Sequence, residues 1–237
     1  MAGTGSLDLA AQYDWLWQQF LKTVPKPFHA SAARPDEDQR RGVTIVGRFS
    51  TSRDPDVWDL LSCLRTHLAG HFIYSDASLH VTAIVPVPAG FREDVPPEAY
   101  VPAFAAVTAN IRDLDFRIDG MSAAGSAIVL RAFPIDSAFE ELRAALRREL
   151  STRGLPNLEQ DLSCYDGVVR PRCTAHVTLA RLAFSDEHLP ERLSRCAVSW
   201  SGVLRIGRLE LVRHDEFMTP EKCRILSSVD LLVPKGG

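Results

Sequence analysis

The chain has 237 residues, of which 46% are hydrophobic and 24% are charged, and its formal net charge is −3. This composition fits one large globular domain or two small lobes and has too many apolar residues for a disordered chain. Proteins that bind a long nucleic-acid backbone are usually basic, so the charge argues against an extended nucleic-acid surface.

The first predicted element is an amphipathic helix over residues 7–24, where apolar side chains recur at helical spacing. Pro25 and Pro27 end this helix. Residues 25–41 are rich in Pro, Asp, Gln and Arg, a composition that indicates a linker. We therefore expect residues 1–41 to be an N-terminal helix and linker extension.

From residue 42 onward, strand and helix patterns alternate. We expect strands over 43–49, 79–87 and 114–121, with helices starting at 54–55 and spanning roughly 97–112. The same order then recurs: a strand over 127–133, a helix opened by a capping box of Ser137 and Glu140, a strand over 174–182, a short helix near 186–195 and strands over 203–213 and 223–233.

We interpret this order as an internal duplication within a single domain over residues 42–233. Copy one spans about 42–121, copy two spans about 126–214, and a final strand covers 222–233. The copies differ chiefly in residues 154–171, a long loop of the kind that often carries function.

The middle strand of each copy contains the tripeptide His-Val-Thr, at 80–82 and at 176–178. Composition alone predicts about 0.3 His-x-Thr tripeptides in this chain, so two at matching positions are informative. Because residues i and i+2 of a strand share a face, His80 projects with Thr82 and His176 with Thr178. Pseudo-symmetric strands could turn both pairs toward one another across a cleft.

Two histidines and two hydroxyls suit phosphodiester chemistry. A neutral and a protonated histidine provide a general base and a general acid near neutral pH. Hydroxyl and imidazolium donors stabilise the charge of a phosphate transition state. This chemistry needs no metal, and a zinc site would need three or four convergent ligands. We expect His80 and His176 to be catalytic, with no cofactor and no metal.

These motifs resemble the two-histidine (2H) phosphoesterase superfamily, most of all the LigT-like RNA 2′,3′-cyclic phosphodiesterases, long labelled 2′-5′ RNA ligases. The resemblance covers about residues 42–233. The segment AHVTLAR at 175–181 is similar to the second motif of the family, and LELVRHDEF at 209–217 is similar to a late strand. The resemblance implies an α+β, bilobal duplicated fold, with two antiparallel sheets flanking a central cleft and helices outside.

The resemblance also implies a metal-independent phosphodiesterase that opens 2′,3′-cyclic phosphates of RNA ends or nucleotides to 2′-phosphates. One histidine would deprotonate water and the other would protonate the leaving oxygen, in an order that the sequence leaves open. Thr82 and Thr178 would hold phosphate oxygens. The alternatives are hydrolysis of 2′,5′-linked or other oligonucleotides by the same residues, and a nucleotide- or RNA-binding module without turnover.

Three further residues are candidates for the substrate site. Arg181 matches the family arginine but lies at an odd offset from His176, so only a bulge or a strand end would bring it to phosphate. Arg172 lies at an even offset from His176 and is an alternative phosphate contact. Tyr165, in the long loop, is a candidate for stacking on a base.

The other histidines and a run of three arginines are interpreted as structural or surface residues. His67 and His71 have the i, i+4 spacing of a metal pair, but we favour a structural interpretation for both. His214 is expected in solvent. The run of Arg143, Arg147 and Arg148 is interpreted as the solvated face of its helix.

The cysteines and the first residues bear on the compartment. The five cysteines form an odd set without a Cys-x-x-Cys pair, which predicts reduced thiols and neither a disulfide framework nor a zinc site. No signal peptide pattern opens the chain, and no apolar stretch approaches a membrane span. We expect a cytoplasmic protein without membrane contact.

Overall fold

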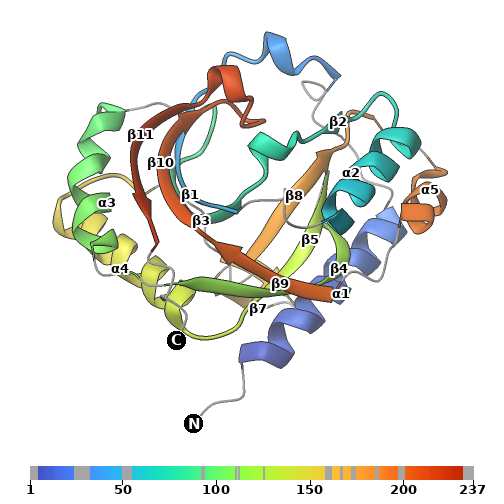
Figure 1. Cartoon of the computed structure of the whole chain (residues 1–237), viewed down its shortest axis with the longest axis horizontal. Coiled ribbons are helices and arrows are strands. Elements are labelled where there is room, and N and C mark those ends of the chain that lie inside the picture. The colour runs from blue at the N-terminus through green and yellow to red at the C-terminus, as the bar shows by residue number, and fades with distance from the viewer. Residues whose placement is uncertain are drawn as a thin grey trace.

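A computed structural model describes residues 5–23, 33–49, 55–91, 94–109, 111, 113–124, 126–157, 162–165, 168–171, 175–184, 187–196 and 201–231. Its main feature is one curled antiparallel sheet of nine strands, flanked by helices (Figure 1). In sheet order the strands are β11 (Arg224–Asp230), β10 (Arg208–His214), β1 (Gly42–Arg48), β3 (Val81–Val87), β8 (Ala175–Arg181), β5 (Ala127–Pro134), β4 (Leu114–Ala124) and β9 (Ser201–Ile206), with β2 (Phe72–Ile73) paired to β8.

The sheet consists of two halves that meet at one residue pair. Strands β11, β10, β1 and β3 form one half, and strands β8, β5, β4 and β9 form the other. Among the described strands, the two halves pair only between Val81 and Val177. The predicted α+β fold with antiparallel strands is confirmed, but the two expected sheets are the halves of one continuous sheet.

The order of the strands is symmetric about the bridge. Strands β1 and β3 occupy the same places in one half as β5 and β8 in the other. The third strand of each proposed copy crosses over: β4 pairs with β5, and β10 pairs with β1. We retain the duplication of 42–121 and 126–214 as a proposal, with exchanged third strands.

The predicted single strand over 203–213 is wrong. It is two strands in different halves, because β9 pairs with β4 whereas β10 pairs with β1 and β11. Gly207 separates them, and its N–H donates to the carbonyl of Arg48 while its own carbonyl accepts from Leu231. The apolar alternation changes phase at this glycine, from Leu204 and Ile206 to Leu209 and Leu211, and the single-strand prediction missed that signal.

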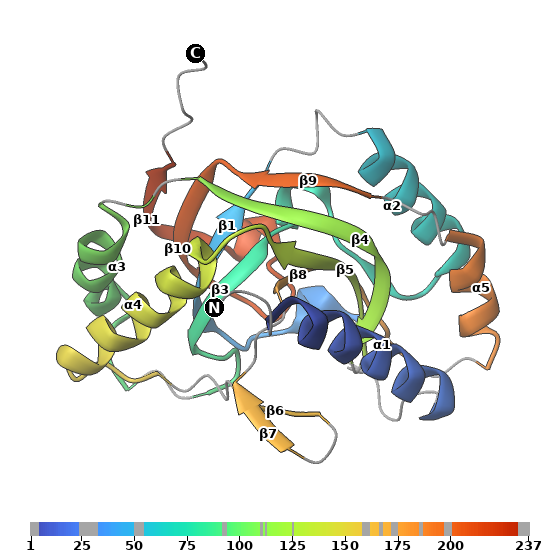
Figure 2. The same cartoon turned by 90° about the horizontal axis from the view of Figure 1, so that it is seen from below.

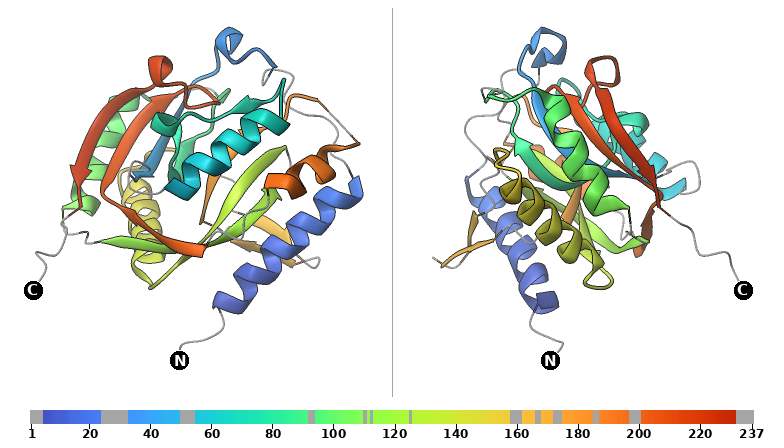
Figure 3. Two further views of the ribbon diagram at one scale, coloured as in Figure 1. Left: turned by 45° about the vertical axis from the view of Figure 1, so that its right-hand side comes forward. Right: turned by 90° about the vertical axis from the view of Figure 1, so that its left-hand side faces the viewer.

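Four helices flank the sheet in two pairs: α2 (Pro55–His67) lies beside α5 (Leu189–Cys196), and α3 (Val101–Thr108) lies beside α4 (Ala138–Thr152) (Figure 3). The predicted apolar face of α4 is buried, at Phe139, Leu142, Leu146 and Leu150.

The capping box predicted for α4 is wrong. The Ser137 hydroxyl donates to the Glu141 carboxylate, and the N–H of Ala138 is bound by Asp136. The solvated-face interpretation is also wrong for Arg143, which is only 2% exposed, although Arg148 is exposed as expected.

Helix α1 (Gly5–Thr23) agrees with the predicted N-terminal helix and lies along β4 and β5 (Figure 2). Residues 24–32 of the predicted linker lie outside the described residues. Beyond them a short 3-10 helix, η2 (Pro35–Glu37), leads into β1. The long loop contains a hairpin of β6 (Leu162–Tyr165) and β7 (Val168–Pro171) that projects from the body (Figure 2).

The expectation of reduced cysteines throughout is wrong. Cys63 of α2 and Cys196 of α5 form a disulfide between residues 133 positions apart. Cys223 is a free thiol, and burial raises its pKa to about 11. The side chains of Cys164 and Cys173 lie outside the description. Among the described residues, no helix has both the length and the apolar character needed to cross a membrane.

Candidate active site

Strand pairing brings the two His-Val-Thr elements side by side. Because Val81 faces Val177 in an antiparallel bridge, His80 lies opposite Thr178 and Thr82 lies opposite His176. Directly opposed residues share a face of the sheet. We call the face that carries these four side chains the histidine face. The sequence suggested two pairs facing one another across a cleft; the structure instead joins them on neighbouring strands.

A β-bulge follows each tripeptide directly. On β3, Thr82 pairs with Val46 but Ile84 pairs with Ile45, so that Ala83 is an extra residue. On β8, Thr178 pairs with Val129 but Ala180 pairs with Ile128, so that Leu179 is extra. Bulges are common beside active sites, where they redirect side chains.

The carbonyl of each extra residue is bound by a donor outside its ladder. The Nε of buried Arg143 donates to the Ala83 carbonyl at 2.9 Å. The backbone N–H of Tyr74 donates to the Leu179 carbonyl at 2.9 Å. A bulge leaves its extra residue out of the ladder, so these donors satisfy polar groups that would otherwise be buried without a partner.

Arg181 lies at an odd offset from His176, and the bulge on β8 shifts it to the face that carries His176. Arg181 pairs with Ala127, as His176 pairs with Arg131, and both partners lie on one face of β5. Arg181 therefore projects from the histidine face. It hydrogen-bonds to the Tyr74 hydroxyl, and its Nη2 lies 4.0 Å from Glu216. The other two candidates, Arg172 and the Tyr165 side chain, lie outside the described residues.

His80 is held as a neutral imidazole. It is 7% exposed, and its Nδ1–H donates to the Ser78 carbonyl at 2.7 Å, which leaves the lone pair on Nε2. Burial, followed by the positive charge of Arg48, lowers the pKa of His80 to about 3. His176 is more exposed than His80.

Arg48 fixes the segment that leads to His80. Its guanidinium donates to the carbonyls of Ala77 and Leu79 and forms a 2.9 Å ion pair with Glu210. Sequence reasoning missed both residues. The available signal was a carboxylate inside an apolar strand, since charges are rarely buried there unless paired.

His214, expected in solvent, is 7% exposed. Its Nε2 lies 2.6 Å from the Thr44 hydroxyl, and its Nδ1 lies 2.5 Å from the Asp215 carbonyl. Burial lowers its pKa to about 4. It is buried because β10 is an interior strand between β1 and β11.

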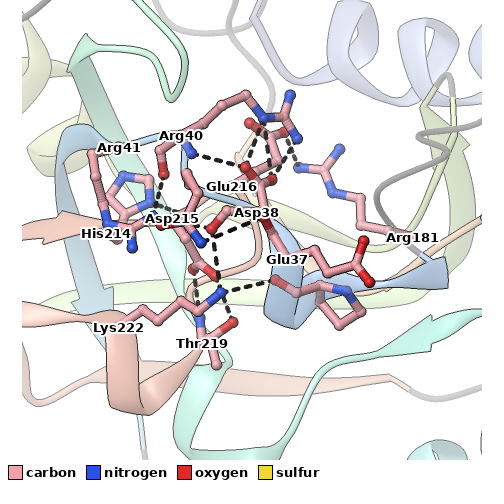
Figure 4. A network of polar contacts seen from close by, with 12 residues as sticks. Glu37, Asp38, Arg40, Arg41, Arg181, His214, Asp215, Glu216, Thr219 and Lys222 are labelled. Atoms are coloured by element: carbon pink, nitrogen blue, oxygen red, sulfur yellow. Dashed lines mark hydrogen bonds and ion pairs between the residues drawn. The ribbon is translucent and has the colours of Figure 1, made fainter.

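The segment before β1 and the loop after β10 are joined near Arg181 (Figure 4). The Lys222 ammonium donates to the carbonyls of Pro35, Asp36 and Asp38. The guanidinium of Arg40 hydrogen-bonds the Asp38 carboxylate and lowers its pKa. The predicted linker thus packs against the loop after β10 near Arg181, a position that its composition did not indicate.

Helix α1 also lies on the histidine face. Tyr13 packs on Phe133 of β5 at 5.4 Å, and its hydroxyl contacts the Ala175 carbonyl. Asp14 forms a 3.0 Å ion pair with Arg131, the residue that is paired with His176. The N-terminal helix therefore covers this face next to the second His-Val-Thr element.

The site combines an acceptor nitrogen, a second imidazole, two hydroxyls and a guanidinium on one face. These groups suit proton transfer beside a bound phosphate. Within the described part of the chain, no third His, Cys, Asp or Glu ligand joins the two histidines in a metal-binding cluster.

Neither a family model nor a curated protein matches this chain. Solved structures do match. The protein TT0787 of Thermus thermophilus is 16% identical, with a TM-score of 0.53, over 81% of this chain and 98% of that one. E. coli LigT complexed with phosphate is 13% identical over the same shares, with a TM-score of 0.49, and LigT complexed with 3′-AMP has a TM-score of 0.46. The chain therefore shares the fold of TT0787.

Proposed function

We propose that this chain is a 2H phosphoesterase, a metal-independent phosphodiesterase that hydrolyses 2′,3′-cyclic phosphates of RNA ends or nucleotides. The observation that carries the proposal is the pairing of Val81 with Val177, which gathers His80, Thr82, His176 and Thr178 on one face. A single phosphate held there needs no basic surface, which agrees with the net charge of −3.

The state of His80 supports an assignment that the sequence left open. An imidazole that donates from Nδ1 keeps its lone pair on Nε2 and can accept a proton, so we assign His80 as the general base and His176 as the general acid. His80 takes a proton from water as the water oxygen bonds to phosphorus. The bond from phosphorus to the 3′-oxygen breaks, and His176 gives that oxygen its proton, which leaves a 2′-phosphate.

The remaining groups stabilise the transition state. The hydroxyls of Thr82 and Thr178 donate to non-bridging phosphate oxygens, and the Arg181 guanidinium balances the developing negative charge. Helix α1 covers the histidine face beside Arg131, and the segment from Pro35 lies near Arg181 (Figure 4). These boundaries favour a nucleotide or an RNA terminus over a long RNA tract.

The test is hydrolysis of 2′,3′-cyclic nucleotides and cyclic-phosphate-ended RNA in the presence of EDTA, with 2′,5′-linked oligoadenylate as a competing substrate. We expect 2′-monophosphates, resolved from 3′-monophosphates by ³¹P NMR. His80→Ala and His176→Ala should each lower kcat at least about 100-fold. The control His188→Ala, whose side chain is 64% exposed, should retain full activity.

Two outcomes would overturn the proposal. Unchanged kcat in both site variants would remove the histidines from the chemistry. Tight nucleotide binding by the wild type without turnover of any substrate would make the chain a binding module.

A further inference from the structure

A second cluster of reactive side chains lies between α2 and α5. Cys63 and His67 lie one helical turn apart on α2, and Cys196 is the last residue of α5. The ligand atoms of these three residues all lie within 4.8 Å of one another. None of the three belongs to the histidine face. Within the described ranges, this is the only such group of three potential metal ligands.

The donor set is one that zinc prefers. Zinc takes cysteine sulfur at about 2.3 Å and histidine nitrogen at about 2.0–2.1 Å in tetrahedral geometry, which places neighbouring ligand atoms about 3.5–3.8 Å apart. The His67 nitrogen lies within 4.8 Å of both sulfurs, and the two sulfurs would separate to this range once their bond is reduced. The Cα atoms of Cys63 and Cys196 are 5.6 Å apart, so side-chain rotation alone serves either a disulfide or a shared ion.

Charge balance also favours a zinc ion at this position. Cys196 is fully buried, and Cys63 and His67 are partly exposed. Two thiolates and a neutral imidazole bring the total charge of a bound Zn²⁺ to zero, so the site buries no uncompensated charge. A disulfide needs no imidazole beside it, whereas a metal centre uses one.

We propose that Cys63, His67 and Cys196 bind Zn²⁺ when the disulfide is reduced. A dithiol reductant supplies two electrons and two protons to open the sulfur–sulfur bond. Zn²⁺ then displaces one proton from each thiol and binds both sulfurs and the His67 imidazole, with water in the fourth position. The disulfide links α2 to α5 in the oxidised protein, and the shared Zn²⁺ links them in the reduced protein.

The experiment measures metal binding by the full-length protein before and after reduction. After reduction, removal of the reductant and dialysis against Zn²⁺, we expect one bound ion per chain. With Co²⁺ as the probe, we expect the thiolate charge-transfer band and the intense ligand-field bands of a tetrahedral site. The oxidised protein should bind neither ion at this site.

Matched variants distinguish the cluster from other thiols. Cys63→Ser and Cys196→Ser should lose the ion, and His67→Ala, which keeps both cysteines, should bind it at least tenfold more weakly. Cys223→Ser should bind normally, because Cys223 lies outside the cluster. Far-UV circular dichroism verifies that each variant is folded.

The proposal is overturned if the reduced wild type binds no zinc, if the cysteine variants keep the ion, or if His67→Ala binds as tightly as the wild type.

Discussion

His80 shows how one local environment determines both chemistry and stability. Its ring is buried and held by the Ser78 carbonyl, so the neutral form is strongly favoured and the pKa falls to about 3. His214, at the other end of the same half-sheet, is buried in the same way with a pKa of about 4. Both rings remain neutral in the folded protein at a pH where an unfolded chain binds protons.

We predict that the free energy of unfolding decreases as the pH falls from 6.5 to 4.5. In this window the unfolded chain protonates both histidines and the folded chain does not, so acid favours unfolding. Each histidine lowers the free energy of unfolding by about 1.4 kcal/mol for every pH unit below the pKa of the unfolded chain. Asp38, whose pKa is lowered, adds its own loss only near and below its ordinary value of 3.8.

Urea denaturation at several pH values measures this slope. His80→Gln and His214→Gln should each flatten it, whereas His188→Gln, at an exposed position, should leave it unchanged. Equal slopes in all four proteins would show that neither buried ring carries the effect.

The residues of the site differ in how far the sequence revealed them. The paired tripeptides made His80 and His176 candidates because the repeated His-Val-Thr is visible in the sequence. The face of Arg181 depended on a bulge, which the apolar pattern of β8 does not show. Tyr74 and Arg48 act through contacts with segments distant in the chain, and no local pattern reports such contacts.

The two bulges are the elements on which the site geometry depends. Each inserts one residue directly after a threonine of the site, and each needs a donor from elsewhere in the fold. On β3 that donor is Arg143 of α4. A helix that is distant in the sequence therefore holds the strand that carries Thr82.

We predict that Arg143→Leu lowers the free energy of unfolding by about 1–3 kcal/mol, because it leaves the Ala83 carbonyl without its donor. It should also lower kcat, since Thr82 precedes the disturbed bulge. Arg148→Leu changes an exposed residue of the same helix and should alter neither quantity. Denaturation and turnover assays compare the pair, and indistinguishable variants would contradict a role for the bulge contact.

Tyr13 of helix α1 is 1% exposed and packs on the sheet. We predict that Tyr13→Ala lowers the free energy of unfolding by about 3–5 kcal/mol through lost packing on Phe133. Tyr13→Phe should cost about 1 kcal/mol, because it removes only the hydroxyl contact with Ala175.

Gln18→Ala, on an exposed position of the same helix, is the control and should change stability little. Thermal or urea denaturation gives the three values, and a Tyr13→Ala protein as stable as the control would mean that α1 does not contribute to the folded domain.

For the whole molecule, the sequence predicted which strands and helices form better than how the strands pair and which cysteines join. The order of strands and helices follows from local periodicity. The crossing of the chain at Gly207 does not, because a change of phase in the apolar pattern marks a break but does not show that the two strands pair in different halves. The disulfide joins cysteines 133 residues apart, and spacing alone does not give such a pairing.

The exchange of third strands has a consequence for how such a molecule arises. A chain holding one copy alone would leave β1 without the outer neighbour that β10 provides, and an open strand edge is prone to pair with another chain. A second identical chain would supply that strand in return. Under the proposed duplication, the one-copy ancestor would be a strand-swapped homodimer, with one His-Val-Thr from each subunit meeting on its two-fold axis.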